Sequence, residues 1–187
     1  MYPKMDRKQH YDSTPKTHET NIAIVRNPYT RLQSIFSHLK WREKEHKNAY
    51  DLINFRSLDE LCNAYYDITH LYHKKAKDIF TWNKNKFNTY YGKLECTKNK
   101  VCIHWCPQYI FTNGYDSKVD YLLKFENLNN DLLKLQKNNI LKKAPLDIKR
   151  NVSTNKYKQL TKLTPICKKL VNEIYKKDFE LWDQSGI

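Results

Sequence analysis

The first regular pattern along the chain is a short apolar segment followed by an amphipathic one. Residues 21–26, NIAIVR, are apolar and partly β-branched, which predicts a short buried strand. Pro28 suits the first turn of a helix that follows this strand. The apolar positions of that helix recur at i, i+3, i+4 and i+7 and form one stripe of Leu32, Ile35, Phe36 and Leu39. The segment therefore predicts a strand, a tight turn and a helix.

Further along the chain, similar signals predict more helices and a second strand. A helix is expected from about residue 58 to residue 72, and YLLKF at 121–125 predicts a second buried strand. Asn127 is expected to cap a helix that continues to about residue 137. Near the end, Thr164 and Pro165 suit the cap and first turn of a C-terminal helix. The apolar stripe of that helix consists of Ile166, Leu170, Ile174 and Tyr175.

Strands that alternate with helices indicate the fold class. We expect an α/β protein with a mainly parallel central sheet flanked by helices. A chain of 187 residues fits one domain, which we expect to span residues 1–187.

Charge and composition narrow the classes of partner. The chain has 34 Lys and Arg against 20 Asp and Glu, a formal net charge of +14, which attracts polyanions such as nucleic acid, acidic glycans and nucleotides. A merely basic surface is the alternative. The sequence has no run of about twenty apolar residues, and its start has no apolar core of a signal peptide. We therefore expect a soluble, intracellular protein without a membrane span, which agrees with an odd number of cysteines, five.

The predicted strand–turn–helix carries the clearest candidate chemistry. Arg26 falls at the carboxyl end of the strand, where open α/β sheets place ligands. The helix that starts two residues later offers amides and a dipole that favour an anion. Ser34 lies two turns into this helix, so that Arg26 and Ser34 together can hold a phosphate. The alternative is that Arg26 pairs with a carboxylate and Ser34 is a surface residue.

The same segment resembles a known family. VRNPYTRLQSIFSHLK is similar to the 3′-phosphate-binding element of carbohydrate-type sulfotransferases, which use 3′-phosphoadenosine 5′-phosphosulfate (PAPS). The resemblance implies that Arg26 and Ser34 bind the 3′-phosphate of PAPS or of its product PAP. Arg31 matches a second arginine of the same element, and we include it among the expected cofactor-binding residues.

Two later segments resemble the same family, in the same order. HWCPQ at 104–108, followed by a strand and FENL at 125–128, is similar to one family stretch, and RNVS at 150–153 with a later IYKKDF at 174–179 to another. The resemblance implies that His104 and Trp105 lie on the substrate side, with a structural role for His104 and core packing for Trp105 as alternatives. Glu126 is expected to order the start of the helix after it, with acid–base catalysis as the alternative. The resemblance also implies a cofactor-binding set that closes over the nucleotide, for which a polar loop is the alternative: Arg150, Asn151 and Ser153.

One part of the family pattern is missing. The family opens with a strand and a Pro-Lys loop that holds the 5′-phosphosulfate, whereas YPKM at 2–5 and TPKT at 14–17 follow no apolar strand. Lys4 and Lys16 are therefore poor matches. We expect the P-loop-NTPase-like sulfotransferase fold in an N-terminally truncated form. An incomplete sequence, an inactive relative and a grip supplied by a partner chain or by unusual basic residues all remain open.

The expected reaction calls for a base, and no metal site is expected. Sulfuryl transfer resembles phosphoryl transfer, and the attacking hydroxyl benefits from a base whose pKa lies near 7. His10, in KQHYDSTPK, matches a family histidine and is the candidate catalytic residue, with a solvated tail histidine as the alternative. We expect no metal, because the set Cys96, Cys102, His104 and Cys106 has no compact zinc spacing.

These observations lead to one expected function and two alternatives. The resemblance implies transfer of a sulfuryl group from PAPS to a hydroxyl of a carbohydrate acceptor. The first alternative is a catalytically inactive relative that binds a nucleotide or another acidic ligand. The second is a basic nucleic-acid-binding module, for which the sequence contains no dedicated motif.

Overall fold

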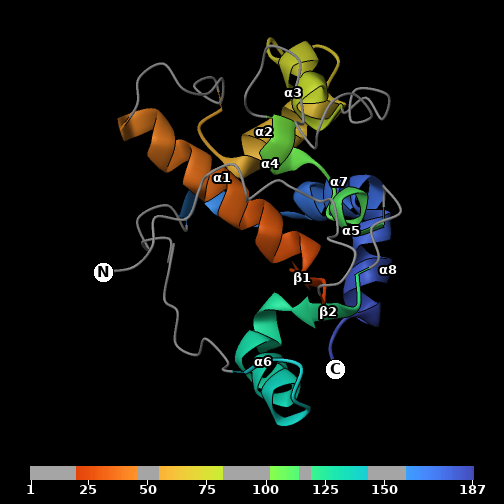
Figure 1. Cartoon of the computed structure of the whole chain (residues 1–187). Helices are drawn as coiled ribbons and strands as arrows, with labels where there is room; N and C mark the ends of the chain where they lie inside the picture. The colour runs from red at the N-terminus through yellow and green to blue at the C-terminus, as the bar shows by residue number, and fades with distance from the viewer. Residues whose placement is uncertain (1–19, 46–54, 82–101, 114–118, 143–158) are drawn as a thin grey trace, which may run out of the picture.

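The two strands expected from the sequence pair with each other in parallel. The computed structural model describes residues 20–45, 55–81, 102–113, 119–142 and 159–187. Within these residues, β1 (Ile22–Val25) pairs with β2 (Tyr121–Lys124), with Ile22 opposite Tyr121 and Val25 opposite Lys124 (Figure 1). The carboxyl ends of both strands therefore lie at the same edge, where β1 continues into a helix and β2 into the 3₁₀ turn η3 (Phe125–Asn127).

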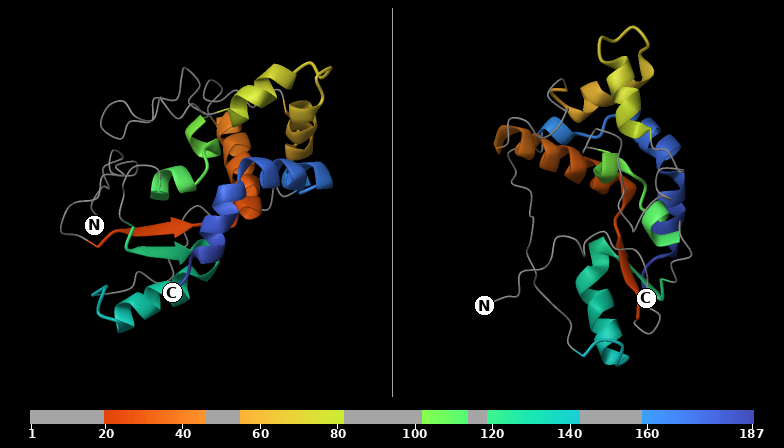
Figure 2. Two further views of the ribbon diagram at one scale, coloured as in Figure 1. Left: turned by 90° about the vertical axis from the view of Figure 1, so that its right-hand side faces the viewer. Right: turned by 45° about the horizontal axis from the view of Figure 1, so that its top comes forward.

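Most of the described residues are helical. The longest helix is α1 (Pro28–Glu45), which runs from the end of β1. The further elements are α2 (Leu58–Tyr66), α3 (His73–Phe80), α4 (Cys102–Trp105), α5 (Tyr109–Asn113), α6 (Leu128–Lys137), the 3₁₀ turn η5 (Gln159–Thr161), α7 (Pro165–Ile174) and α8 (Lys176–Gln184). Figure 2 shows α6 beside the two strands, and Figure 1 shows the other helices around α1, at the top and the right of the view.

The apolar stripe of α1 forms part of the larger of two hydrophobic clusters. Leu32, Phe36 and Leu39 are buried, while Ile35 is half-buried against the same cluster, as the i, i+3, i+4, i+7 spacing predicts. Side chains from α2, α3, α4 and α7 complete this cluster. A smaller cluster around Leu123 and Leu135 packs α6 against β2.

Two helices are shorter than the sequence pattern predicts, and local hydrogen bonds end the first of them. The helix expected from 58 to 72 ends at Tyr66, since the Asp67 carboxylate accepts hydrogen bonds from the backbone N–H and the hydroxyl of Thr69, at 2.9 and 2.7 Å. The chain then starts the separate helix α3. The C-terminal helix is likewise divided at Tyr175 into α7 and α8.

The expected helix caps are confirmed at one position and changed at another. Thr164 is the N-cap of α7, its hydroxyl accepts from the Cys167 N–H, and Pro165 occupies the first turn. Asn127 is also the N-cap residue of α6, but its side chain makes no capping hydrogen bond. Its amide instead donates to the Asp131 carboxylate at 2.8 Å, and Asp131 accepts from the Lys124 N–H at 3.1 Å.

Candidate anion-binding site

Arg26 lies where the sequence predicted it, directly after the last residue of β1. Its Nε donates to the Thr30 hydroxyl at 3.1 Å, and its guanidinium lies over the exposed ring of Phe125, 4.7 Å from the ring centre. The Nη atoms of Arg26 donate to no other residue that the structure describes. These two Nη groups are therefore the part of the guanidinium that can bind an anion as a fork.

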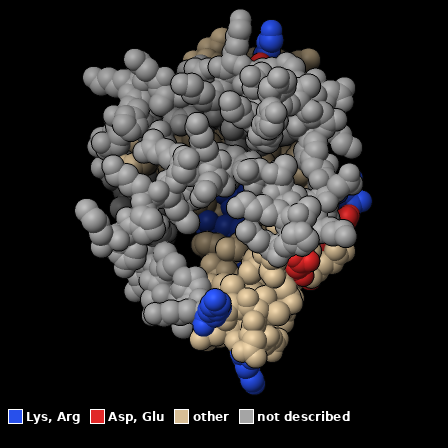
Figure 3. Space-filling view, viewed as in Figure 1, with Lys and Arg blue, Asp and Glu red and all other residues tan. Residues whose placement is uncertain are grey.

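Ser34 lies on the same face of α1 as Thr30. The two residues are four positions apart, so that their side chains are neighbours on the helix surface. The Ser34 side chain is half-buried, and its hydroxyl bonds to no side chain or carbonyl within the described part of the chain. Arg26, Thr30 and Ser34 thus follow one line from the strand end along the helix. Figure 3 shows that basic side chains lie recessed near the centre of the face seen in Figure 1.

A carboxylate already occupies the N-terminus of α1. Glu126 Oε1 accepts from the Asn27 N–H at 3.0 Å and from the Thr30 hydroxyl at 3.1 Å. The Asn27 side chain accepts from the Tyr29 N–H at 3.0 Å, and Pro28 has no N–H. The expectation that these amides attract a ligand therefore needs correction for Asn27 and Tyr29, because the protein's own side chains accept from both N–H groups. The expected contact of Arg26 and Ser34 with an anion stays a prediction.

Glu126 also differs from its expected role. We expected it to order the start of the helix after it, whereas its carboxylate bonds to the start of α1, 99 positions earlier, and to Trp182 Nε1 at 3.0 Å. Partial burial opposes ionisation, but hydrogen bonds from Trp182, the Asn27 amide, its own amide and Thr30 hold the pKa of Glu126 below its ordinary value. Glu126 is therefore a structural carboxylate that links β2, α1 and α8.

Burial and two neighbouring charges of opposite sign act on Arg26. Burial lowers the pKa of the Arg26 guanidinium, Glu126 opposes this effect, and the neighbouring charge of Arg31 adds to it. Arginine nonetheless stays protonated in proteins. Two guanidinium groups close enough to repel each other gain stability when an anion lies between or beside them.

Gln108 holds the Arg26 backbone in place. Its side-chain oxygen accepts from the Arg26 N–H and its side-chain nitrogen donates to the Arg26 carbonyl, both at 2.8 Å. Asp178, fully buried on α8, accepts in turn from the N–H groups of Gln108 and Tyr109, at 2.8 and 2.9 Å. Burial raises the pKa of Asp178, while these hydrogen bonds oppose the rise. A continuous set of hydrogen bonds therefore fixes the strand end against α8.

Arg31 points to the interior side of the site. Its Nη2 donates to the carbonyl oxygens of His104 and Cys106, at 3.1 and 2.6 Å. Its guanidinium also lies 5.8 Å from the ring centre of Tyr175, whose hydroxyl donates to the Trp105 carbonyl at 2.7 Å. The structure thus uses Arg31 to hold the segment around α4. The expected contact between Arg31 and the cofactor stays a prediction.

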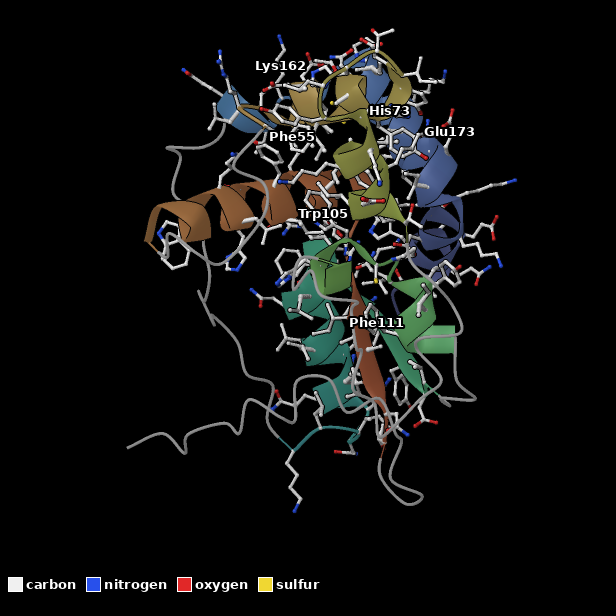
Figure 4. All side chains as sticks on the ribbon, turned by 90° about the horizontal axis from the view of Figure 1, so that it is seen from above. Phe55, His73, Trp105, Phe111, Lys162 and Glu173 are labelled. Carbon is white, nitrogen blue, oxygen red and sulfur yellow. The ribbon has the colours of Figure 1, made fainter. Side chains whose placement is uncertain are left out.

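The two expected substrate-side residues lie in different surroundings. His104 is half-buried, and its ring meets that of His38, one turn beyond Ser34 on α1, at 5.8 Å between ring centres. Trp105 has no exposed surface and packs edge-on against Phe80 at 5.3 Å (Figure 4). Trp105 therefore packs in the core, as the alternative predicted. Contact of His104 or Trp105 with a substrate stays a prediction.

Several expected site residues lie outside the described residues. They comprise the catalytic candidate His10, the cofactor-binding set Arg150, Asn151 and Ser153, and the weak matches Lys4 and Lys16. Their roles stay predictions. Among the described residues there is also no group of three or more His, Cys, Asp or Glu side chains that could hold a metal ion.

Thr30, Gln108 and Asp178 were not among the expected site residues, although Gln108 and Asp178 lie in the HWCPQ and IYKKDF segments that resemble the family. Thr30 had a usable signal, because it lies four positions after Arg26 and four before Ser34. Gln108 and Asp178 had none in local pattern, since their hydrogen bonds join residues about 70 to 82 positions apart.

These features define the class of the protein. It is an α/β protein in which parallel strands end at one edge, with a guanidinium and a hydroxyl arranged along the helix that leaves that edge. The chain matches the model of the sulfotransferase family over residues 1–183, and it therefore belongs to this family. Neither the comparison with curated proteins nor that with solved structures gives a match. Within the described ranges, no helix is both long and apolar enough to cross a membrane.

Proposed function

We propose that this protein transfers a sulfuryl group from PAPS to a hydroxyl of a carbohydrate acceptor. Membership of the sulfotransferase family supports transfer of a sulfuryl group. The observation that carries the proposal of a nucleotide donor is the arrangement of Arg26 after β1 and Ser34 on α1. In the proposal these two side chains bind the 3′-phosphate of PAPS.

The geometry of Arg26 supports this assignment. Thr30 fixes Nε, Phe125 supports one face of the guanidinium, and Gln108 fixes the peptide on both sides. The guanidinium is therefore largely ordered before a ligand arrives, so that binding loses little conformational entropy. The Ser34 hydroxyl adds a donor one turn beyond Thr30. A hydrogen bond to a charged oxygen contributes about 1.5–3 kcal/mol.

The acceptor side is assigned to the region beyond Ser34. His104 and His38 lie together there, next to Trp41, whose ring centre is 5.9 Å from that of His38. Exposed aromatic and imidazole groups suit the apolar faces and hydroxyls of a sugar. In the proposal His10 acts as the base that removes the proton of the acceptor hydroxyl, and the segment with Arg150, Asn151 and Ser153 closes over the nucleotide.

Binding of PAP tests the donor site. We expect millimolar PAP to raise the melting temperature by several degrees, because a ligand that binds only the folded state stabilises it. Arg26→Ala should remove most of this shift, and Ser34→Ala should weaken PAP affinity about 10- to 100-fold. Arg56→Ala is the matched control, since Arg56 is exposed and lies at the start of α2, away from β1. No shift with PAP, or an equal shift in Arg26→Ala and the parent, would overturn the proposal.

Transfer itself needs a second measurement. Radiolabelled PAPS is incubated with a panel of hydroxyl-bearing glycans, and we expect label in at least one of them. His104→Ala should lower transfer while PAP still raises the melting temperature as in the parent. PAP binding without transfer to any acceptor would favour the inactive relative instead.

A further inference from the structure

Two buried cysteines face each other across the interface between α2 and α7. Cys62 lies on α2 and Cys167 on α7, and the two helices pack together in the large hydrophobic cluster (Figures 1 and 2). Both side chains are completely buried. The two helices are also joined next to these thiols, because the Thr164 hydroxyl lies 3.2 Å from Cys167 Sγ and donates to the carboxylate of Asp59, three positions before Cys62 on α2. The two thiols also share a side-chain hydrogen bond. The sequence gives no hint of this pair, because positions 62 and 167 are 105 residues apart.

Groups around Cys167 favour its thiolate. Cys167 is in the first turn of α7, and its Sγ lies 3.2 Å from the hydroxyl of Thr164, the N-cap residue. The hydrogen bond with Cys62 lowers the pKa of Cys167 to about 7, against the effect of burial, and Thr164 contributes to the lowering. The same hydrogen bond, together with burial, raises the pKa of Cys62. Cys167 is therefore the better nucleophile of the two.

We propose that Cys62 and Cys167 form a disulfide that joins α2 to α7 when the chain folds in the presence of a small-molecule disulfide. A disulfide requires these hydrogen-bonded sulfur atoms to approach to about 2.05 Å. The third described cysteine, Cys106, is also buried but lies in the segment after α4 that Arg31 holds.

The chemistry is thiol–disulfide exchange. The thiolate of either cysteine attacks one sulfur of oxidised glutathione, and one glutathione thiolate leaves and takes up a proton. The other cysteine, after loss of its proton, attacks the protein sulfur of the mixed disulfide, and the second glutathione leaves. The two protein thiols lose two electrons and two protons in all, and one oxidised glutathione becomes two reduced glutathione molecules. Because both side chains are buried, the exchange takes place before the helices close over them.

Peptide mapping of the full chain tests the proposal directly. The unfolded, reduced protein is refolded in a mixture of oxidised and reduced glutathione, its remaining thiols are alkylated, and it is digested with trypsin without reductant. The cross-linked product joins residues 57–74 to residues 163–168, the tryptic peptides that contain Cys62 and Cys167. We expect this product in the refolded sample and its disappearance after treatment with dithiothreitol.

The melting temperature supplies an independent readout. A bond that closes a loop of roughly 100 residues restricts the unfolded chain strongly, and we expect oxidised protein to melt about 10 °C above reduced protein. Cys62→Ser and Cys167→Ser should each abolish this difference, while the control Cys106→Ser should keep it. Free thiols at both positions after refolding in the glutathione mixture would overturn the proposal, as would a cross-link of either cysteine to another partner. The outcome does not depend on whether the protein binds PAP.

Discussion

The carboxylate of Glu126 shows at the residue scale how a side chain can take the place reserved for a ligand. It accepts hydrogen bonds from Asn27, Thr30 and Trp182, which come from the start of α1 and from α8. An anion at a helix N-terminus is stabilised by the amides and the dipole there. In this protein an anion at that place belongs to the chain, and the proposed ligand site therefore rests on the side chains of Arg26 and Ser34.

The low pKa of Glu126 makes its contribution to stability dependent on pH. Its folded-state pKa lies below the ordinary value of about 4.3. The stabilisation is thus fully present above that ordinary value and is lost as the pH falls through the folded-state pKa. Glu126→Gln should destabilise the protein at pH 7, and its difference from the parent should shrink between about pH 5 and pH 3. Urea unfolding at several pH values measures this, with Glu180→Gln, an exposed carboxylate on α8, as the control. A constant difference across the range would contradict the prediction.

Trp105 contributes volume to the core while its polar atom is left unpaired. The side chain is completely buried, and its indole Nε1 has no hydrogen-bond partner among the described residues. Trp105→Ala should lower the free energy of unfolding by about 3–5 kcal/mol because of the cavity it leaves. Trp105→Phe keeps most of the ring and removes the unpaired N–H, so its loss should be clearly smaller. Equal losses in chemical denaturation would show that ring volume is not what matters at this position.

Gln108 connects elements that are distant in sequence. It brackets the Arg26 peptide at the end of β1, and its own N–H is held by Asp178 of α8. The position of Arg26 is therefore set by Gln108, just before α5, and by α8 as much as by its own strand. A displaced guanidinium would bind a phosphate less well, because a fork of two donors depends on its orientation.

Gln108→Ala should weaken PAP binding without removing any group that contacts the phosphate. We expect the PAP dissociation constant to rise roughly tenfold, equivalent to about 1.4 kcal/mol, because Arg26 loses both backbone restraints. Isothermal titration calorimetry measures the constant. Gln184→Ala, an exposed glutamine at the end of α8, is the control and should bind PAP as the parent does. Unchanged affinity in Gln108→Ala would show that Thr30 and Phe125 alone position the guanidinium.

At the scale of the whole molecule, the net charge of +14 acts over a distance. Such a field raises the local concentration of a polyanion and speeds its association. It does not select the ligand, and the local groups around Arg26 must do so. Salt separates the two contributions, because the screening length falls from about 10 Å at 0.1 M to about 3 Å at 1 M.

PAP affinity should therefore fall moderately with salt, by roughly tenfold between 0.1 M and 1 M NaCl. A nucleic-acid-binding module would behave differently, since affinity for a polyphosphate backbone falls as a high power of the salt concentration. Titrations of PAP and of a single-stranded oligonucleotide at both salt concentrations compare the two. Tight oligonucleotide binding that persists while PAP fails to bind would favour the nucleic-acid alternative.

The chain's local patterns determined the elements that depend on neighbouring residues. The apolar segment at 22–25 forms β1, the stripe from Leu32 to Leu39 turns α1 toward the core, and Thr164 with Pro165 starts α7. The prediction that β1 is buried was wrong for most of its length, because only Val25 is buried and Ile24 is exposed. The relation between Thr30 and Ser34 also follows from sequence, because helix geometry places residues four apart on one face, whereas Arg26 precedes the helix and is joined to it by its hydrogen bond to Thr30. The helix end at Tyr66 was missed, since the side chain of Asp67 competes with the helical hydrogen bonds there.

Only the tertiary structure decided which side chains surround that local unit. Glu126 reaches α1 from 99 positions away, Gln108 reaches Arg26 from 82, and Cys62 meets Cys167 across two packed helices. Periodicity describes which face of an element is apolar but not which other element covers that face. These partners are therefore fixed by the path of the whole chain, and the path is chosen by burial of the common core.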